Sequence, residues 1–216
     1  GFDKLRETVH EMDEFLIDIL VPIYKAGKVP ILVGGGHNNA YPLMKAFFLA
    51  HNKKVNVANL DPHADYRALE GRHSGNSFSY AMNEGILNAY SVFGLHKPYN
   101  SAEMLGRMEA DGVEYLCYED YLDNNRNLVD DARNFVEKHQ NNFGLELDLD
   151  SIAEMPTSAM SPSGWTVSEA RQWLRAMKNG NPVYFHFTEG APELDNQGGN
   201  KVGKTLAYFV CDVIEK

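Results

Sequence analysis

Six side chains of kinds that bind divalent cations follow apolar segments of this chain. They are His37, Asp61, His63, Asp65, Asp148 and Asp150. The first follows residues 29–33 and three glycines, the next three follow residues 55–60, and the last two follow residues 143–147. Alternate residues of an extended segment point to the same side, so each array would aim its groups in one direction.

Four carboxylates and two imidazoles gathered at one point could not be buried as bare charge. The absence of thiolates disfavours structural zinc and suits manganese, with iron, cobalt or zinc as alternatives. Carboxylates can bridge two cations about 3.5–4 Å apart, and such a pair lowers the pKa of a bound water to near neutrality. One Asp-x-His-x-Asp match alone would fit a turn in which Asp65 caps a helix. The combination of arrays favours a site for two divalent ions.

The elements that position these side chains alternate between strand and helix. Apolar runs predict strands at 29–33, 55–60, 90–95, 113–118, 143–148 and 183–187. Helical spacing predicts helices at 5–20 (ended by Gly27), 39–51, 101–109, 128–139, 167–178 and 202–214. This alternation predicts a three-layer α/β/α fold with a mainly parallel sheet. Functional groups then meet at the carboxyl ends of the strands, where the polar connections 68–76 and 151–164 would form a substrate pocket.

Composition and charge argue against nucleic-acid-binding and membrane-spanning proteins. The chain has 216 residues, 44% apolar content and a net charge of −10, which predicts one domain and excludes a broad nucleic-acid-binding face. Residues 15–23 are interrupted by Asp18, so a membrane span is not expected. Cys117 and Cys211 lie in apolar runs and are expected to be buried free thiols in the cytoplasm. A homo-oligomer is compatible with the sequence.

The chain resembles the ureohydrolases, the superfamily of arginase, agmatinase and formimidoylglutamase. The resemblance lies in five segments that occur in family order: Gly34-Gly35-Gly36-His37, Asp61-Pro62-His63-Ala64-Asp65, Ser74-Gly75-Asn76, Glu146-Leu147-Asp148-Leu149-Asp150 and Glu189-Gly190-Ala191-Pro192. The first strand and helix of the family have no counterpart. We therefore expect residues 1–216 to form a single arginase-like domain that is N-terminally truncated.

The resemblance implies a role for each site residue. One manganese would be bound by His37, Asp61, Asp65 and Asp148, and the other by His63, Asp61, Asp148 and Asp150. Asp65 would pass a proton from water to the leaving amine, and Glu189 would hold a cationic amidine or guanidine group. The groups expected to contact substrate are Ser74, Asn76, Arg67, Arg72 and His73, with a solvated loop charge as the alternative role of the arginines, of Arg72 above all. His186 is read as a core residue or as a support behind the ligands.

Departures from the family pattern bear on the substrate. Gly36 in place of aspartate, and Arg67 after Asp65, are typical of formimidoylglutamase-like members, while Phe78 stands where arginases carry histidine. We expect hydrolysis of formimidoylglutamate to glutamate and formamide, in histidine degradation. Arginase, agmatinase and a catalytically silent relative remain alternatives, and the six expected ligands argue against the deacetylase branch. Glu146 in place of serine leaves the substrate open.

Overall fold

A computed structural model describes residues 1–123, 126–196, 198 and 200–215. Six parallel strands form one sheet in the order β1-β6-β5-β2-β3-β4. The strands are β1 (Ile31–Val33), β2 (Val55–Leu60), β3 (Leu87–Leu95), β4 (Glu114–Cys117), β5 (Phe143–Asp148) and β6 (Tyr184–Thr188). All six correspond to predicted strands, which confirms the parallel α/β fold class.

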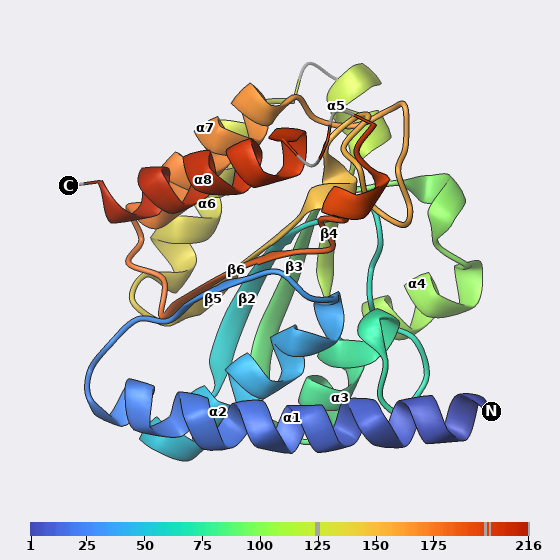
Figure 1. Cartoon of the computed structure of the whole chain (residues 1–216). Coiled ribbons are helices and arrows are strands. Elements are labelled where there is room, and N and C mark those ends of the chain that lie inside the picture. The colour runs from blue at the N-terminus through green and yellow to red at the C-terminus, as the bar shows by residue number, and fades with distance from the viewer. Residues whose placement is uncertain (124–125, 197, 199, 216) are drawn as a thin grey trace.

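Helices cover both faces of this sheet (Figure 1). They are α1 (Phe2–Lys25), α2 (Ala40–His51), α3 (Ser77–Asn83), α4 (Ala102–Ala110), α5 (Tyr118–Asp123), α6 (Leu128–His139), α7 (Val167–Lys178) and α8 (Asn200–Ile214). Short 3-10 turns lie at η1 (His37–Asn39), η2 (Ser74–Asn76), η3 (Lys97–Tyr99), η4 (Leu149–Ser151) and η5 (Pro192–Leu194). The short helices α3 and α5 were not among the predicted elements.

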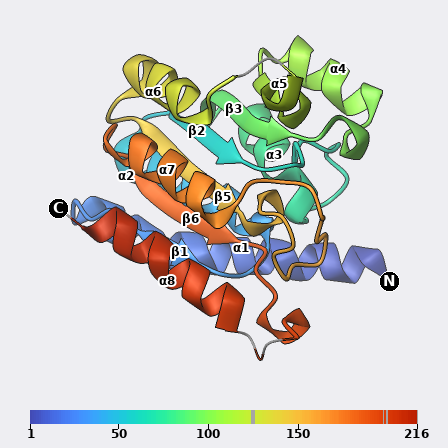
Figure 2. The same ribbon diagram turned by 90° about the horizontal axis from the view of Figure 1, so that it is seen from above.

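Two apolar cores lie between the sheet and the helices, one on each face of the sheet. One core joins α1, α2, α3 and α4 to side chains such as Val57 and Tyr184, and the other joins α6, α7 and α8 to neighbours such as Ala58 and Phe185. Adjacent strand residues thus serve opposite cores, as the alternation of a pleated strand requires. Figure 2 shows α8 beside β1 and β6, at the opposite end of the sheet from α4 and α5.

Local signals define several helix boundaries. Asn127 caps α6 by accepting hydrogen bonds from the backbone N–H groups of Val129 and Asp130. Thr166 and Glu169 form a capping box at the start of α7. Both helices have the bounds that the sequence predicted.

Two surface features differ from expectation. Cys117 is buried as predicted, but Cys211 is exposed because it lies on the outer side of α8; both thiols are free.

In α1 the buried side chains include Ile17 and Leu20, whereas much of the apolar stripe predicted from the spacing is exposed. No helix in the described residues is long and apolar enough to cross a bilayer.

Candidate metal centre and substrate cavity

Strand order brings the two aspartate arrays together. β2 and β5 are hydrogen-bonded neighbours with Leu60 opposite Leu147, so Asp61 and Asp148 meet at the carboxyl edge of the sheet. The strand that follows β2 in the chain, β3, lies on one side of this pair, and the strand that follows β5, β6, lies on the other side. The arrays therefore lie at the topological switch point, where open α/β sheets usually form their binding sites.

His37 reaches the same point from β1. Gly34 (φ +91°) and Gly35 (φ +72°) adopt a left-handed backbone that allows the chain to turn sharply after the strand, as expected from the sequence. The Ser77 hydroxyl donates to the His37 carbonyl at 2.8 Å, and the Phe78 ring packs edge-on against the imidazole. These contacts fix a fully buried ring.

Three carboxylates converge on the Nδ1 atom of His37. It lies 2.9 Å from Asp65 Oδ2, 3.1 Å from Asp148 Oδ2 and 3.2 Å from Asp61 Oδ2. Among the described residues none of these contacts has hydrogen-bond geometry, so Nδ1 is a buried polar atom without a hydrogen-bond partner. Since one proton could satisfy only one of the three oxygens, the arrangement fits a shared cation, and these four residues form a candidate metal-binding group.

The pKa values of Asp65, Asp148 and Asp150 point to a cation as well, whereas contacts with His37 and His63 outweigh burial and lower the pKa of Asp61. Burial, reinforced by the charges of Asp61 and Asp150, holds the pKa of Asp148 well above its usual range. Burial and the Asp61 charge likewise raise the pKa of Asp65, and burial raises that of Asp150 to about 6. Carboxylates that resist ionisation because they crowd together are those that a divalent cation stabilises.

A second, looser group lies beside the first. His63 Nδ1 is 3.4 Å from Asp61 Oδ1 and 3.6 Å from Asp150 Oδ2. Burial lowers the pKa of His63, but contacts with Asp61 and other carboxylates outweigh it and raise the value to about 10. Asp61 thus directs one oxygen to His37 and the other to His63, as a bridging carboxylate would.

The arrays do not converge by strand alternation, which corrects the sequence-based interpretation. β2 ends at Leu60, and Asp65 has a positive φ of 47°. Asp150 lies in η4 rather than on a strand. The first aspartate of each array instead accepts a hydrogen bond from the backbone two residues later, at 2.7 Å in both cases, which closes a turn.

A cavity of about 330 Å³ opens beside these groups. Its lining includes His63, Asp65, Arg67, His73, Ser74, Asp148, Asp150 and Glu189. Glu189 follows β6 and has a positive φ of 64°. The Arg67 side chain is 62% exposed and lies 3.0 Å from Glu70.

Arg72 and Asn76, expected to contact substrate, do not line this cavity. The Arg72 guanidinium is buried and donates to Asp13 at 2.9 Å and to the side-chain oxygen of Asn76 at 2.6 Å. The Asn76 amide in turn donates to the carbonyl groups of Ala68 and Gly71. Both side chains therefore hold the loop together, which corrects the expected substrate contact.

Three supporting residues were missed by the sequence reasoning. Asn59 donates to Asp61 Oδ2 at 3.0 Å, and Asn100 bonds the backbone of residues 62 and 64. The Tyr99 ring stacks on His63 at 5.4 Å. The only available signal was position, since Asn59 precedes Asp61 by two residues and the other two follow the end of β3.

Formimidoylglutamases are among the known proteins to which this chain is similar in sequence. The chain is 27% identical over 215 residues to a formimidoylglutamase of Geobacillus thermodenitrificans, covering 95% of the chain and 64% of that relative. It is 29% identical to a formimidoylglutamase of Staphylococcus carnosus, covering 98% of the chain and 68% of the relative. The chain thus spans about two thirds of the length of these relatives.

A solved structure shares the fold. The formiminoglutamase of Trypanosoma cruzi with Mn²⁺ superposes with a TM-score of 0.84 at 19% identity, over 96% of this chain and 72% of that chain. The model of the arginase family matches residues 7–214. The chain therefore belongs to the arginase family, as the motifs in its sequence predicted.

Proposed function

We propose that this protein is a manganese-dependent hydrolase that cleaves a carbon–nitrogen bond of a linear amidine, with formimidoylglutamate as its substrate. The observation that carries the proposal is the convergence of three carboxylates on Nδ1 of His37, which has no hydrogen-bond partner among the described residues; two of these carboxylates, Asp65 and Asp148, line the same cavity as Glu189. The formimidoylglutamases among its relatives support the choice of substrate.

The chain's residues would hold two ions. His37, Asp61, Asp65 and Asp148 would bind the first, and His63, Asp61, Asp148 and Asp150 the second. When bound, two such ions lower the pKa of water and stabilise negative charge that develops on the substrate. Oxygen and imidazole ligands suit manganese.

Asp65 would move the proton that hydrolysis requires. Its carboxylate lies on the cavity, and burial together with the Asp61 charge raises its pKa, which suits a group that accepts a proton and later releases it. In the reaction, water adds its oxygen to the amidine carbon and the bond from that carbon to the glutamate nitrogen breaks. Asp65 would accept a proton from water and deliver it to the leaving nitrogen.

Glu189 would orient the cationic amidinium. One of its oxygens accepts the backbone N–H of His37 at 2.6 Å, which leaves the other available to the substrate. An amidinium presents paired N–H donors, and a carboxylate accepts them through charge-assisted hydrogen bonds.

The other end of formimidoylglutamate carries two carboxylates. Arg67, His73 and Ser74 line the cavity and could donate to them. Agmatine lacks a carboxylate, so an agmatinase would have little use for Arg67. The six ligand residues and Glu189 also argue against a catalytically silent relative.

The remaining expectations belong to the same proposal. Residues 1–216 would form one arginase-like domain of a cytoplasmic enzyme of histidine degradation, acting on a small molecule rather than on nucleic acid or membranes. A homo-oligomer is compatible with this proposal.

The test is a side-by-side assay of formimidoylglutamate, arginine and agmatine with manganese-loaded protein. We expect glutamate and formamide from the first substrate and little turnover of the others. Preferred release of urea from agmatine or arginine would contradict the proposed substrate while retaining the family chemistry. Turnover of none of the three, in protein that binds manganese, would favour the silent relative.

A further inference from the structure

A row of buried polar side chains crosses the sheet next to the candidate metal groups, and two of its members, on β2 and β5, precede Asp61 and Asp148 by two residues. Asn59 pairs in register with Glu146, and Glu146 pairs with His186, across β2, β5 and β6. All three side chains are fully buried, and they occupy the face of the sheet covered by α1, α2 and α3. Buried polar groups in an apolar sheet need partners, so their contacts indicate what the row does.

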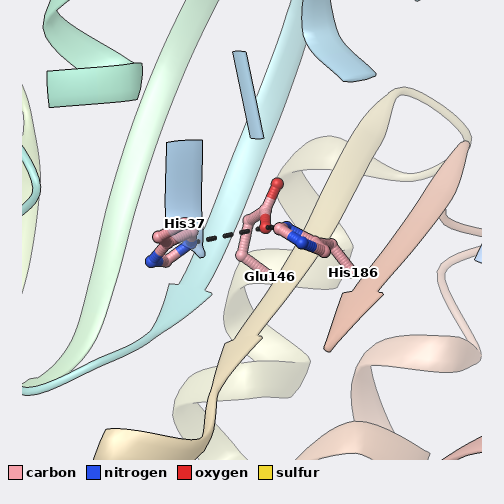
Figure 3. A group of neighbouring side chains, drawn as sticks. All are labelled: His37, Glu146 and His186. Atoms are coloured by element: carbon pink, nitrogen blue, oxygen red, sulfur yellow. Dashed lines mark hydrogen bonds and ion pairs between the residues drawn. The ribbon is translucent and has the colours of Figure 1, made fainter. Parts of the chain in front are cut away.

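Glu146 lies between His37 and His186 (Figure 3). Its Oε2 is 2.5 Å from His186 Nδ1 and 3.4 Å from His37 Nε2, and its Oε1 accepts the Tyr184 hydroxyl at 2.8 Å. The absent side chain of Gly144 makes room for this arrangement, because a Cβ there would lie 2.0 Å from the Tyr184 ring. Glu146 is thus held from two sides and faces the back of His37.

The two ring nitrogens of His37 face different groups. A neutral imidazole can offer a lone pair on Nδ1 only when its proton sits on Nε2. Nδ1 faces Asp61, Asp65 and Asp148, where a cation would bind. Nε2 lies 3.4 Å from Glu146 Oε2, within ion-pair range, and like Nδ1 it makes no hydrogen bond among the described residues. A carboxylate behind a metal-binding histidine favours the tautomer that binds metal and raises the basicity of the ring.

The trio of His37, Glu146 and His186 could alternatively hold a cation of its own. The distances disfavour this reading. Ligand atoms of a tetrahedral ion at about 2.0–2.1 Å lie roughly 3.3 Å apart, whereas His186 Nδ1 and Glu146 Oε2 are separated by 2.5 Å, a hydrogen-bond distance. His186 is therefore a hydrogen-bond partner that fixes the position of the Glu146 carboxylate.

We propose that Glu146, held by His186 and Tyr184, is a positioning residue that presents the Nδ1 lone pair of His37 to the first manganese. This inference rests on the proposed function. It assigns a role to a position where the resemblance leads one to expect serine, and it makes His186 a support for Glu146.

The experiment compares manganese affinity and the His37 tautomer in wild type, Glu146→Gln and Tyr184→Phe. Affinity is measured by competition with a fluorescent chelator, and the tautomer by long-range ¹H–¹⁵N NMR of protein with a subsaturating amount of diamagnetic Zn²⁺. We expect Glu146→Gln to weaken the tighter manganese by about 10–100-fold and to lower the fraction of His37 in the Nε2–H form that binds metal through Nδ1. Tyr184→Phe should weaken binding less.

Tyr24→Phe is the matched control, because it also removes a buried tyrosine hydroxyl, one that donates to the Leu43 carbonyl rather than to Glu146. It should leave both readouts at the wild-type values. If Glu146→Gln does not fold, Tyr184→Phe still decides the matter.

The outcomes separate the two proposals. Wild type that binds no manganese overturns the proposed function and, with it, this inference. Wild type that binds manganese, beside Glu146→Gln and Tyr184→Phe variants with unchanged affinity and tautomer, overturns the positioning role alone. An equal loss of affinity in Tyr24→Phe would also overturn it, because the effect would then reflect general destabilisation.

Discussion

Glu189 Oε1 accepts the backbone N–H of His37 at 2.6 Å, although the two residues lie 152 positions apart in the chain. The contact exists because β1 and β6 are parallel neighbours, so the residues after both strands leave the sheet at the same edge. The backbone N–H of Glu189 also donates to the Gly35 carbonyl at 3.0 Å. The residue proposed to orient the substrate is therefore anchored to the turn that positions His37, a candidate metal ligand.

Glu189→Gln should reduce kcat/KM while manganese content stays at the wild-type level. The amide oxygen can still accept the His37 N–H, so the variant removes the charge and keeps the anchor. Removing one partner of a desolvated charge pair costs about 3–5 kcal/mol, which corresponds to a loss of roughly 10²–10⁴-fold. Steady-state kinetics and elemental analysis measure the two quantities.

Glu193→Gln, at an exposed position in η5, serves as the control and should behave as wild type. Near wild-type turnover in Glu189→Gln would show that its carboxylate does not contact the cationic substrate.

Asp61→Asn and Asp148→Asn should impair both manganese ions, whereas His63→Asn should mainly weaken one. The reason is that Asp61 directs an oxygen toward each histidine, while His63 contacts only the second group. Loss of a direct ligand should exceed the roughly 10–100-fold effect of removing a supporting partner. Metal titration followed by mass spectrometry of bound metal measures the stoichiometry.

Asp111→Asn, which alters a partner of the Tyr66 hydroxyl, is the control. A single ion per chain in wild type, or identical losses in all three site variants, would contradict the two-ion arrangement.

Addition of manganese should raise the free energy of unfolding of the wild-type protein. A ligand that binds only the folded state contributes about 2.7 kcal/mol at 100 times its dissociation constant. Chelation should reverse the gain, and Asp148→Asn should largely abolish it because the carboxylate faces His37 within the candidate group. Thermal or urea unfolding with and without manganese provides the measurement, and an equal gain in the variant would argue against binding at this site.

Arg67→Ala should raise KM for formimidoylglutamate more than it lowers kcat. The side chain lines the cavity and is not part of the candidate metal-binding group around His37. A hydrogen bond to a charged group contributes about 1.5–3 kcal/mol, so KM should rise about 10–100-fold. Arg133→Ala, an exposed arginine on α6 paired with Asp130, is the matched control. An unchanged KM in Arg67→Ala would remove Arg67 from the substrate-binding groups.

The contribution of Asp13 to the free energy of unfolding should decrease as the pH rises from about 4 to 6. Burial raises the pKa of Asp13 from its ordinary 3.8 to about 6, although the nearby Arg72 guanidinium opposes the shift. In that window the folded state binds the proton that the unfolded state has released, so this group's contribution to stability decreases with increasing pH. Asp13→Asn should flatten the dependence in urea unfolding, and an unchanged slope would contradict the assignment.

Arg72→Ala should lower the free energy of unfolding by about 3–5 kcal/mol, because it leaves the Asp13 carboxylate buried without its partner. A merely solvated loop arginine would change stability by less than about 0.5 kcal/mol on substitution. The Arg72→Ala variant therefore distinguishes the structural role seen here from the substrate contact that the sequence suggested.

Much of the fold was predictable because its signals are local. Apolar runs indicated all six strands, and helical spacing predicted α6 and α7 with the bounds that the structure has. The short helices α3 and α5 lacked such a signal, since a few residues show little periodicity.

The sequence by itself also identified the candidate ligands, because several arrays of acidic and imidazole groups follow apolar strands, and this combination favours a metal site where one array alone would not. Only the tertiary structure decided which groups meet. The adjacency of β2 to β5, and of β1 to β6, depends on strand order, which neighbouring residues in the sequence do not encode. The same reason separates Arg67, which lies on the cavity, from Arg72, which is buried against Asp13 from α1. Two arginines five positions apart thus have different surroundings, because Arg72 pairs with Asp13 from a distant part of the chain while Arg67 pairs with nearby Glu70.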